Sequence, residues 1–162
     1  MKLEIERRFL VDQKRLPSLP TGKLLTQGYL SKEINKTSPI VRVRTAGSNA
    51  TLTIKGYRSE VTKAEFEYPI PLKDAEVLLK ECIGQVQKVR YLLKVSGKVW
   101  SIDFYEGENF PLIVAEIELK SEKEKFEKPL WVTKEVTDEP RFHAYQLALK
   151  PFNSWKKSVN FR

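Results

Sequence analysis

Charged residues occur along this sequence in pairs of one sign, with a single residue between the two members of each pair. The acidic pairs are Glu4 with Glu6, Glu65 with Glu67, and Glu116 with Glu118, and the basic pairs are Arg42 with Arg44 and Lys88 with Arg90. Close carboxylates raise each other's pKa unless a divalent cation neutralises them, and close guanidinium groups favour a multivalent anion. A metal-bound polyphosphate would supply both partners, so phosphate chemistry is the first hypothesis.

The spacing of these pairs places them on one face of extended strands. Residues i and i+2 of a strand point to the same side, so Glu4, Glu6 and Arg8 share a face while Leu3 and Phe9 point the other way. Two single charges continue the same pattern on other strands, namely Lys55 and Asp103. For any one pair, a solvated and salt-bridged sheet face is the ordinary interpretation. The segregation of acids and bases onto different strands favours a binding surface instead.

Eight stretches have the apolar patterning of strands, and three have that of helices. The predicted strands are residues 3–11, 24–31, 40–45, 50–55, 64–70, 86–95, 98–105 and 112–120, and the predicted helices are 71–83, 121–127 and 138–149. Turn signals such as Ala-Gly-Ser-Asn at 46–49 predict antiparallel hairpins. The predicted fold class is therefore α+β and mainly β: an eight-stranded antiparallel barrel with its charged face inside. The helices at 71–83 and 138–149 are expected to cover the apolar outer face.

Length and composition exclude several other classes of protein. The 162 residues suit one domain spanning 1–162, and a net charge of +8 attracts phosphates, nucleic acid or anionic membranes without choosing among them. A lone cysteine, Cys82, and a lone histidine, His143, exclude an internal disulfide and a zinc cluster of Cys and His. We assign His143 no chemistry. No long apolar run and no signal-peptide block occur, so we expect a cytoplasmic protein, with 151–162 as a loosely held tail.

The order of the charged motifs resembles that of the CYTH superfamily, the triphosphate tunnel metalloenzymes. The matching segments are Glu4-Ile5-Glu6-Arg7-Arg8, Gln27-Gly28-Tyr29-Leu30, Arg42-Val43-Arg44, Thr53-Ile54-Lys55, Glu65-Phe66-Glu67, Lys88-Val89-Arg90-Tyr91, Asp103, Glu116-Ile117-Glu118 and the stretch from Glu135 to Ala148. One such motif carries little information, but this many in one order over residues 3–149 is specific. The chain looks most like the short, single-domain bacterial members related to inorganic triphosphatases.

The resemblance implies a closed tunnel with a C-terminal plug helix and a requirement for Mg²⁺ or Mn²⁺. The implied metal-binding residues are Glu4, Glu6, Glu65, Glu67, Asp103, Glu116 and Glu118. The implied substrate-binding residues are Arg8, Arg42, Arg44, Lys55, Lys88 and Arg90. Catalysis is expected from Lys88 as a proton-handling cation, from Glu4 and, in a minor role, from Tyr29.

Three residues depart from the family's pattern. Arg8 stands where the ExExK signature has lysine, and because a guanidinium does not release its proton, Arg8 cannot act as a base. Phe142 stands where tyrosine is usual and Ala144 where asparagine is common, so the contacts of the plug helix are expected to differ.

The predicted function is metal-dependent hydrolysis of a triphosphate phosphoanhydride, with inorganic tripolyphosphate as the favoured substrate. Three alternatives remain open: a class IV-type adenylate cyclase, a thiamine triphosphatase, and a non-catalytic protein that binds polyphosphate or nucleotide. The expected partner is a small-molecule triphosphate. We expect neither a membrane nor a nucleic-acid partner, and we leave a homodimer open.

Overall fold

One antiparallel sheet dominates the computed structural model, which describes residues 2–32 and 37–158. Its strands are β1 (Lys2–Val11), β2 (Lys23–Tyr29), β3 (Ile40–Ala46), β4 (Asn49–Tyr57), β5 (Thr62–Pro69), β6 (Gly84–Val95), β7 (Lys98–Tyr105), β8 (Ile113–Glu118) and β9 (Val132–Glu135). Within the sheet they follow the order β5-β4-β3-β2-β6-β7-β8-β1-β9.

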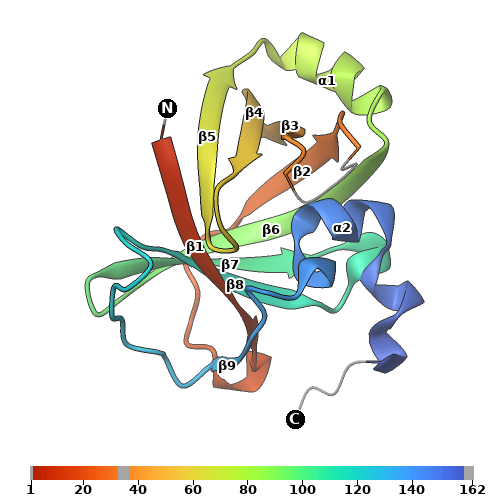
Figure 1. The fold of residues 1–162 in the computed structure, drawn as a ribbon. Helices are drawn as coiled ribbons and strands as arrows, with labels where there is room; N and C mark the ends of the chain where they lie inside the picture. Colours follow the sequence, from red (N-terminus) through yellow and green to blue (C-terminus); the bar gives the residue numbers. More distant parts are fainter. Residues whose placement is uncertain (1, 33–36, 159–162) are drawn as a thin grey trace.

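The first strand closes the sheet into a barrel. The start of β1 pairs with β5, with Leu3 opposite Ala64, and its second half pairs with β8, with Arg8 opposite Glu116. Figure 1 shows β1 in red, crossing between these two strands. The predicted closed barrel of eight antiparallel strands is confirmed. A ninth strand, β9, was not predicted. It pairs with Phe9 and Val11 at the end of β1.

Alternation along β1 separates a polar interior from an apolar exterior. Phe9 points to the outer face of the barrel. There it is fully buried in a cluster with Trp100 and Ile117. Residues after β8 cover this cluster, and Phe126 packs edge-on against Phe9 and Trp100 with ring centroids 6.0 and 5.8 Å away. The predicted helix at 121–127 is therefore wrong, because packing of Phe126 on the barrel outweighs the local helix preference of a charged segment.

A second part of the outer face lies under α1 (Leu72–Lys80), which begins directly after Pro71. Ala75 of this helix is buried with Val43 and Ala50 of the barrel. The chain after α1 approaches β2 closely, since a Cβ added at Gly28 would lie 2.4 Å from Cys82 Sγ. The helix predicted at 71–83 is confirmed in a shorter form, on the predicted outer face.

The helix predicted at 138–149 is shorter and lies elsewhere. It consists of the 3-10 turn η3 (Pro140–Phe142) and α2 (Ala144–Leu149). Phe142 and Leu147 are buried in one cluster with Leu10 and Val86. Leu10 and Val86 are the next inner-facing positions beyond charged residues of β1 and β6, so this segment plugs one end of the barrel instead of covering its outside. The C-terminal plug helix that the family resemblance implied is confirmed. Figure 1 shows α2 in blue beside β6.

The chain after α2 is held more firmly than the predicted loose tail. Phe152 is buried in the plug cluster, and its backbone N–H donates to Asn109 Oδ1 at 2.8 Å. Trp155 packs edge-on against Phe142 with ring centroids 5.3 Å apart. Residues 159–162 of the predicted tail lie outside the described residues. The remaining 3-10 turns are η1 (Gln13–Arg15), η2 (Gly107–Asn109), η4 (Phe152–Ser154) and η5 (Lys156–Ser158).

Candidate functional site

The barrel encloses a cavity of about 450 Å³. The predicted site residues that line it are Glu4, Glu6, Arg8, Tyr29, Arg42, Arg44, Lys55, Glu65, Glu67, Lys88, Arg90, Glu116 and Glu118. They come from seven strands and converge because each strand turns its alternate side chains inward. The single predicted residue outside this lining is Asp103, which lies behind it.

The wall made by β1 and β8 alternates carboxylates with Arg8. The strand register places Glu6 opposite Glu118, and Arg8 opposite Glu116. Arg8 forms an ion pair with Glu6 and donates from Nε to Glu116 Oε1 at 3.0 Å. Burial raises the pKa of the Glu116 carboxyl, but Arg8 and Arg90 outweigh burial and hold that pKa well below its usual range. The Glu116 carboxyl is thus ionised at neutral pH. Glu118 reaches the solvent, where it pairs with Lys2.

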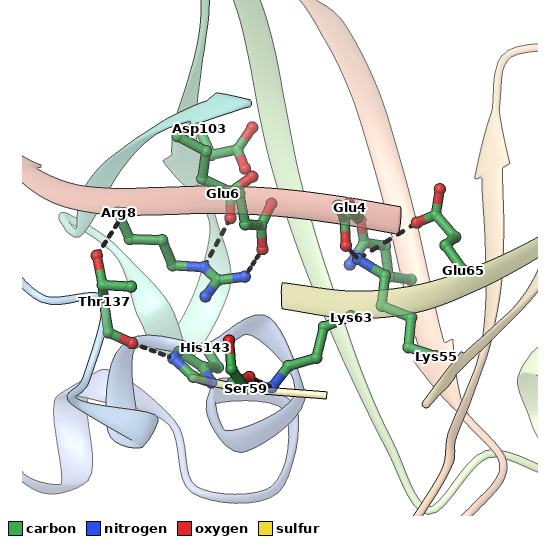
Figure 2. Close-up of polar contacts among 12 residues, drawn as sticks. Glu4, Glu6, Arg8, Lys55, Ser59, Lys63, Glu65, Asp103, Thr137 and His143 are labelled. Carbon is green, nitrogen blue, oxygen red and sulfur yellow. Dashed lines mark hydrogen bonds and ion pairs between the residues drawn. The ribbon is translucent and has the colours of Figure 1, made fainter. Parts of the chain in front are cut away.

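A lysine of β4 lies between an acid of β1 and an acid of β5. Lys55 Nζ pairs with Glu4 and lies 3.4 Å from Glu65 Oε2 (Figure 2). Burial raises the pKa of Glu4, yet the ammonium group of Lys55 lowers that pKa below its usual value. On the next inner position, Thr53 Oγ1 donates to Glu67 Oε2 at 3.1 Å.

Guanidinium groups crowd on the wall formed by β3 and β6. Burial, together with the charges of Arg42 and Arg90, lowers the pKa of Arg44 to about 10. Arg44 Nε donates to Gln27 Oε1 at 2.9 Å, and an Nη of Arg42 donates to Thr53 Oγ1 at 3.0 Å. Arg42 Nε is buried and has no hydrogen-bond partner among the described residues. A multivalent anion would relieve this repulsion and supply the missing acceptor.

The side chain of Asp103 holds two cations in place. It is fully buried, accepts two hydrogen bonds from Arg90 at 2.6 Å, and pairs with Lys88 Nζ. Lys88 itself is 2% exposed, and burial outweighs the attraction of Asp103 and lowers the pKa of Lys88 to about 8. A lysine with this pKa is neutral in about a tenth of the molecules at pH 7, and this neutral form can accept a proton.

Tyr29 lies where the cavity meets the plug. Its hydroxyl accepts a hydrogen bond from Gln27 Nε2 at 3.2 Å, and its ring packs edge-on against Tyr145 of α2 with centroids 5.2 Å apart. Burial raises the pKa of this hydroxyl. Tyr29 is thus a neutral group that links the cavity wall to α2.

A family model described as the CYTH domain matches residues 2–145. The chain belongs to the CYTH family. Its relatives include the inorganic triphosphatase of Acetivibrio thermocellus, 36% identical over 159 residues, which cover 97% of this chain and 100% of the relative. The inorganic triphosphatase of Nitrosomonas europaea is 32% identical over 154 residues, covering 90% and 97%. A crystal structure of an inorganic triphosphatase superposes with a TM-score of 0.67 and 32% identity over 93% of this chain and 97% of its own.

Triphosphatases of the CYTH family depend in general on a metal ion. Carboxylate oxygens are suitable ligands for a hard divalent cation, and the strand register brings two of them, Glu6 and Glu118, opposite each other. As the side chains stand, no group of three Asp, Glu, Cys or His residues in the described part of the chain is arranged to hold a metal. Glu4 and Glu6 instead pair with Lys55 and Arg8. The chemistry of the donor set, carboxylate oxygens, suits the metal.

Among the residues of this CYTH cavity that sequence reasoning did not assign to the site are Gln27, Lys63 and His143. Gln27 and Lys63 line it, and both follow the alternation of residues already assigned on their strands, Tyr29 on β2 and Glu65 on β5. His143 also lines it, although no strand pattern points to a residue in the turn before α2. Among the described helices, none combines the length and apolarity that crossing a membrane requires.

Proposed function

We propose that this chain is an inorganic triphosphatase that hydrolyses tripolyphosphate with the help of Mg²⁺ or Mn²⁺. The observation that carries the proposal is the convergence of Arg42, Arg44 and Arg90 on an enclosed cavity, with the pKa of Arg44 lowered to about 10. The opposite wall carries carboxylates, so the cavity has partners for both an anion and a cation. The likeness to two inorganic triphosphatases over nearly the whole chain supports the same activity.

The side chains suit hydrolysis of a phosphoanhydride because this reaction needs positioning and charge neutralisation more than covalent help. The guanidinium groups of Arg42 and Arg44 bind phosphate oxygens, and Arg8 extends this contact along β1. Glu6 and Glu118 would hold the divalent cation, with Glu4, Glu65, Glu67 and Glu116 as further oxygen donors. When bound, the cation neutralises charge on the phosphates. Neutral Lys88 takes the proton from the attacking water, and Tyr29 contributes its hydroxyl at the plug end.

We assign Asp103 a different role from the metal binding predicted from the sequence. Both of its oxygens already accept hydrogen bonds from cationic groups, and it lies outside the cavity lining. We propose that it is a positioning residue that orients Arg90 toward the substrate and keeps Lys88 in place.

Phosphate release from three substrates tests the activity. The purified protein is assayed with tripolyphosphate, ATP and thiamine triphosphate, each with Mg²⁺, with Mn²⁺ and with EDTA. We expect release from tripolyphosphate to exceed the other two and to stop in EDTA. Formation of cyclic AMP from ATP would identify an adenylate cyclase instead. Preferential hydrolysis of thiamine triphosphate would identify a thiamine triphosphatase. Inactivity on all three substrates would refute enzymatic function.

Substitution of Arg44 is expected to weaken substrate binding. Arg44→Gln removes one charge-assisted hydrogen bond, but it also relieves the repulsion among Arg42, Arg44 and Arg90, so we expect the lower end of the usual range, a KM for tripolyphosphate about tenfold higher. Initial rates at varied substrate concentration measure the effect. The exposed Lys73→Gln on α1 loses the same charge outside the cavity and should leave KM unchanged. A change in kcat alone would contradict this role.

Two further statements stay predictions from the sequence: a cytoplasmic location and a single domain spanning 1–162. Whether the protein forms a homodimer stays open.

A further inference from the structure

The imidazole of His143 borders the charged cavity. The residue directly precedes α2 and lines the cavity, and its Nε2 lies 3.0 Å from the carbonyl oxygen of Thr137. A carbonyl oxygen only accepts hydrogen bonds, so Nε2 carries the proton, and Nδ1 is the lone-pair nitrogen of the neutral ring. Figure 2 shows the ring between Thr137 and Lys63, below Arg8.

The segment that holds His143 is fixed to β1. The backbone N–H of Arg8 donates to Thr137 Oγ1 at 3.0 Å, and the N–H of Val136 donates to the carbonyl of Arg8 at 2.9 Å. Thr137 Oγ1 in turn donates to Glu135 Oε1 at 2.8 Å. The orientation of the imidazole is therefore set by the barrel wall beside Arg8.

Charges from three strands act on the imidazole: Arg8 of β1, Lys63 of β5 and Glu116 of β8. Burial and the cations Arg8 and Lys63 lower the pKa of His143 to about 3, against the opposing effects of the Thr137 carbonyl and Glu116. With the side chains in this arrangement, the ring is neutral at pH 7. A polyanion between Arg8 and Lys63 would reverse the sign of the potential at Nδ1 and favour the charged ring.

We propose that His143 is a substrate-binding residue that takes up a proton from solvent when triphosphate binds and then donates Nδ1–H to a terminal phosphate oxygen. The inference rests on the proposed function. A terminal phosphate is the expected partner because Arg8 is the last charged inner residue of β1, and the next, Leu10, belongs to the apolar plug. The proton returns to solvent when product leaves, and no covalent bond to His143 forms.

The protonation state of His143 can be read directly because it is the only histidine in the chain. Protein without a histidine tag is labelled with ¹⁵N, and long-range ¹H–¹⁵N correlations of the imidazole are recorded at pH 7 in EDTA, which prevents turnover. We expect one protonated nitrogen, Nε2, in the free protein, and two when tripolyphosphate saturates it. Calorimetry under the same conditions verifies binding. Binding heat with an imidazole that stays neutral would overturn this inference alone, and so would the absence of binding. Inactivity on all three substrates in the presence of Mg²⁺ or Mn²⁺ would overturn the proposed function as well.

His143→Gln provides the matched variant. The amide of glutamine can still donate to the Thr137 carbonyl, but it does not take up a proton. We expect a KM for tripolyphosphate about tenfold higher, because one charge-assisted hydrogen bond to the substrate is lost, with kcat within about twofold of the wild type. Calorimetry in buffers of different ionisation enthalpy should show about one proton less taken up than by the wild type, and this difference separates His143 from Lys88. Equal KM and equal proton uptake would contradict the proposal.

Discussion

Replacing Glu6 with glutamine lowers the turnover of tripolyphosphate by at least about a hundredfold while leaving the barrel folded. The side chain keeps its shape and can still accept a hydrogen bond from Arg8, so the wall of the cavity is preserved. What is lost is one of the two opposed carboxylates, Glu6 and Glu118, that we propose to hold the divalent cation. A metal ion at a transferring phosphate contributes several kcal/mol to the rate, and a hundredfold corresponds to about 2.7 kcal/mol.

The metal dependence of the rate measures this effect. Initial rates are recorded over a titration of Mg²⁺ and of Mn²⁺, and we expect the Glu6→Gln protein to need more of either metal for half-maximal activity. Glu76→Gln, on the exposed face of α1, makes the same chemical change outside the cavity and should behave as the wild type. Thermal unfolding verifies that both variants are folded. Full activity of Glu6→Gln at low metal would remove Glu6 from the metal site.

The barrel could be predicted from the sequence because the pattern that defines each strand lies within a few neighbouring residues. A strand repeats every two residues, so the alternation of Glu4, Glu6 and Arg8 with apolar residues specifies which side chains face inward. The same rule, applied to each strand, placed all but one of the predicted site residues on the cavity lining. Asp103 obeys the rule as well, but its neighbours Lys88 and Arg90 lie between it and the cavity, and no sequence pattern specifies such a second layer.

Tertiary contacts decided what local patterns could not. Residues 121–127 carry the charges of a solvated helix, yet Phe126 packs on Trp100 and the segment stays irregular. The short β9 escaped prediction because four residues hardly establish a period. Its Glu135 pairs with Arg7, which explains a cation on the otherwise apolar outer side of β1. His143 reached the cavity through the plug segment, whose place depends on the inner-facing Leu10 at the barrel end.

Replacing Lys88 with arginine lowers kcat/KM for tripolyphosphate by about a thousandfold. The substitution keeps a positive charge next to Asp103, but a guanidinium does not release its proton and therefore cannot accept one from water. A positioned proton acceptor contributes roughly 10²–10⁴ to a rate, and a thousandfold lies in the middle of this range. Lys88→Gln removes both the charge and the base and should be at least as slow.

The pH dependence of kcat/KM separates a base from a binding cation because this ratio reports the free enzyme. Burial lowers the pKa of Lys88 to about 8, so below pH 8 the neutral fraction falls about tenfold with each unit of pH. If Lys88 is the base, the wild-type ratio rises with pH up to about 8 and then levels, and Lys88→Arg lacks this rise. If Lys88 only binds phosphate, the ratio instead falls above pH 8 and Lys88→Arg keeps most of the activity. The wild type and the Lys88 variants can be compared directly, because Asp103 holds Arg90 in place in each of them.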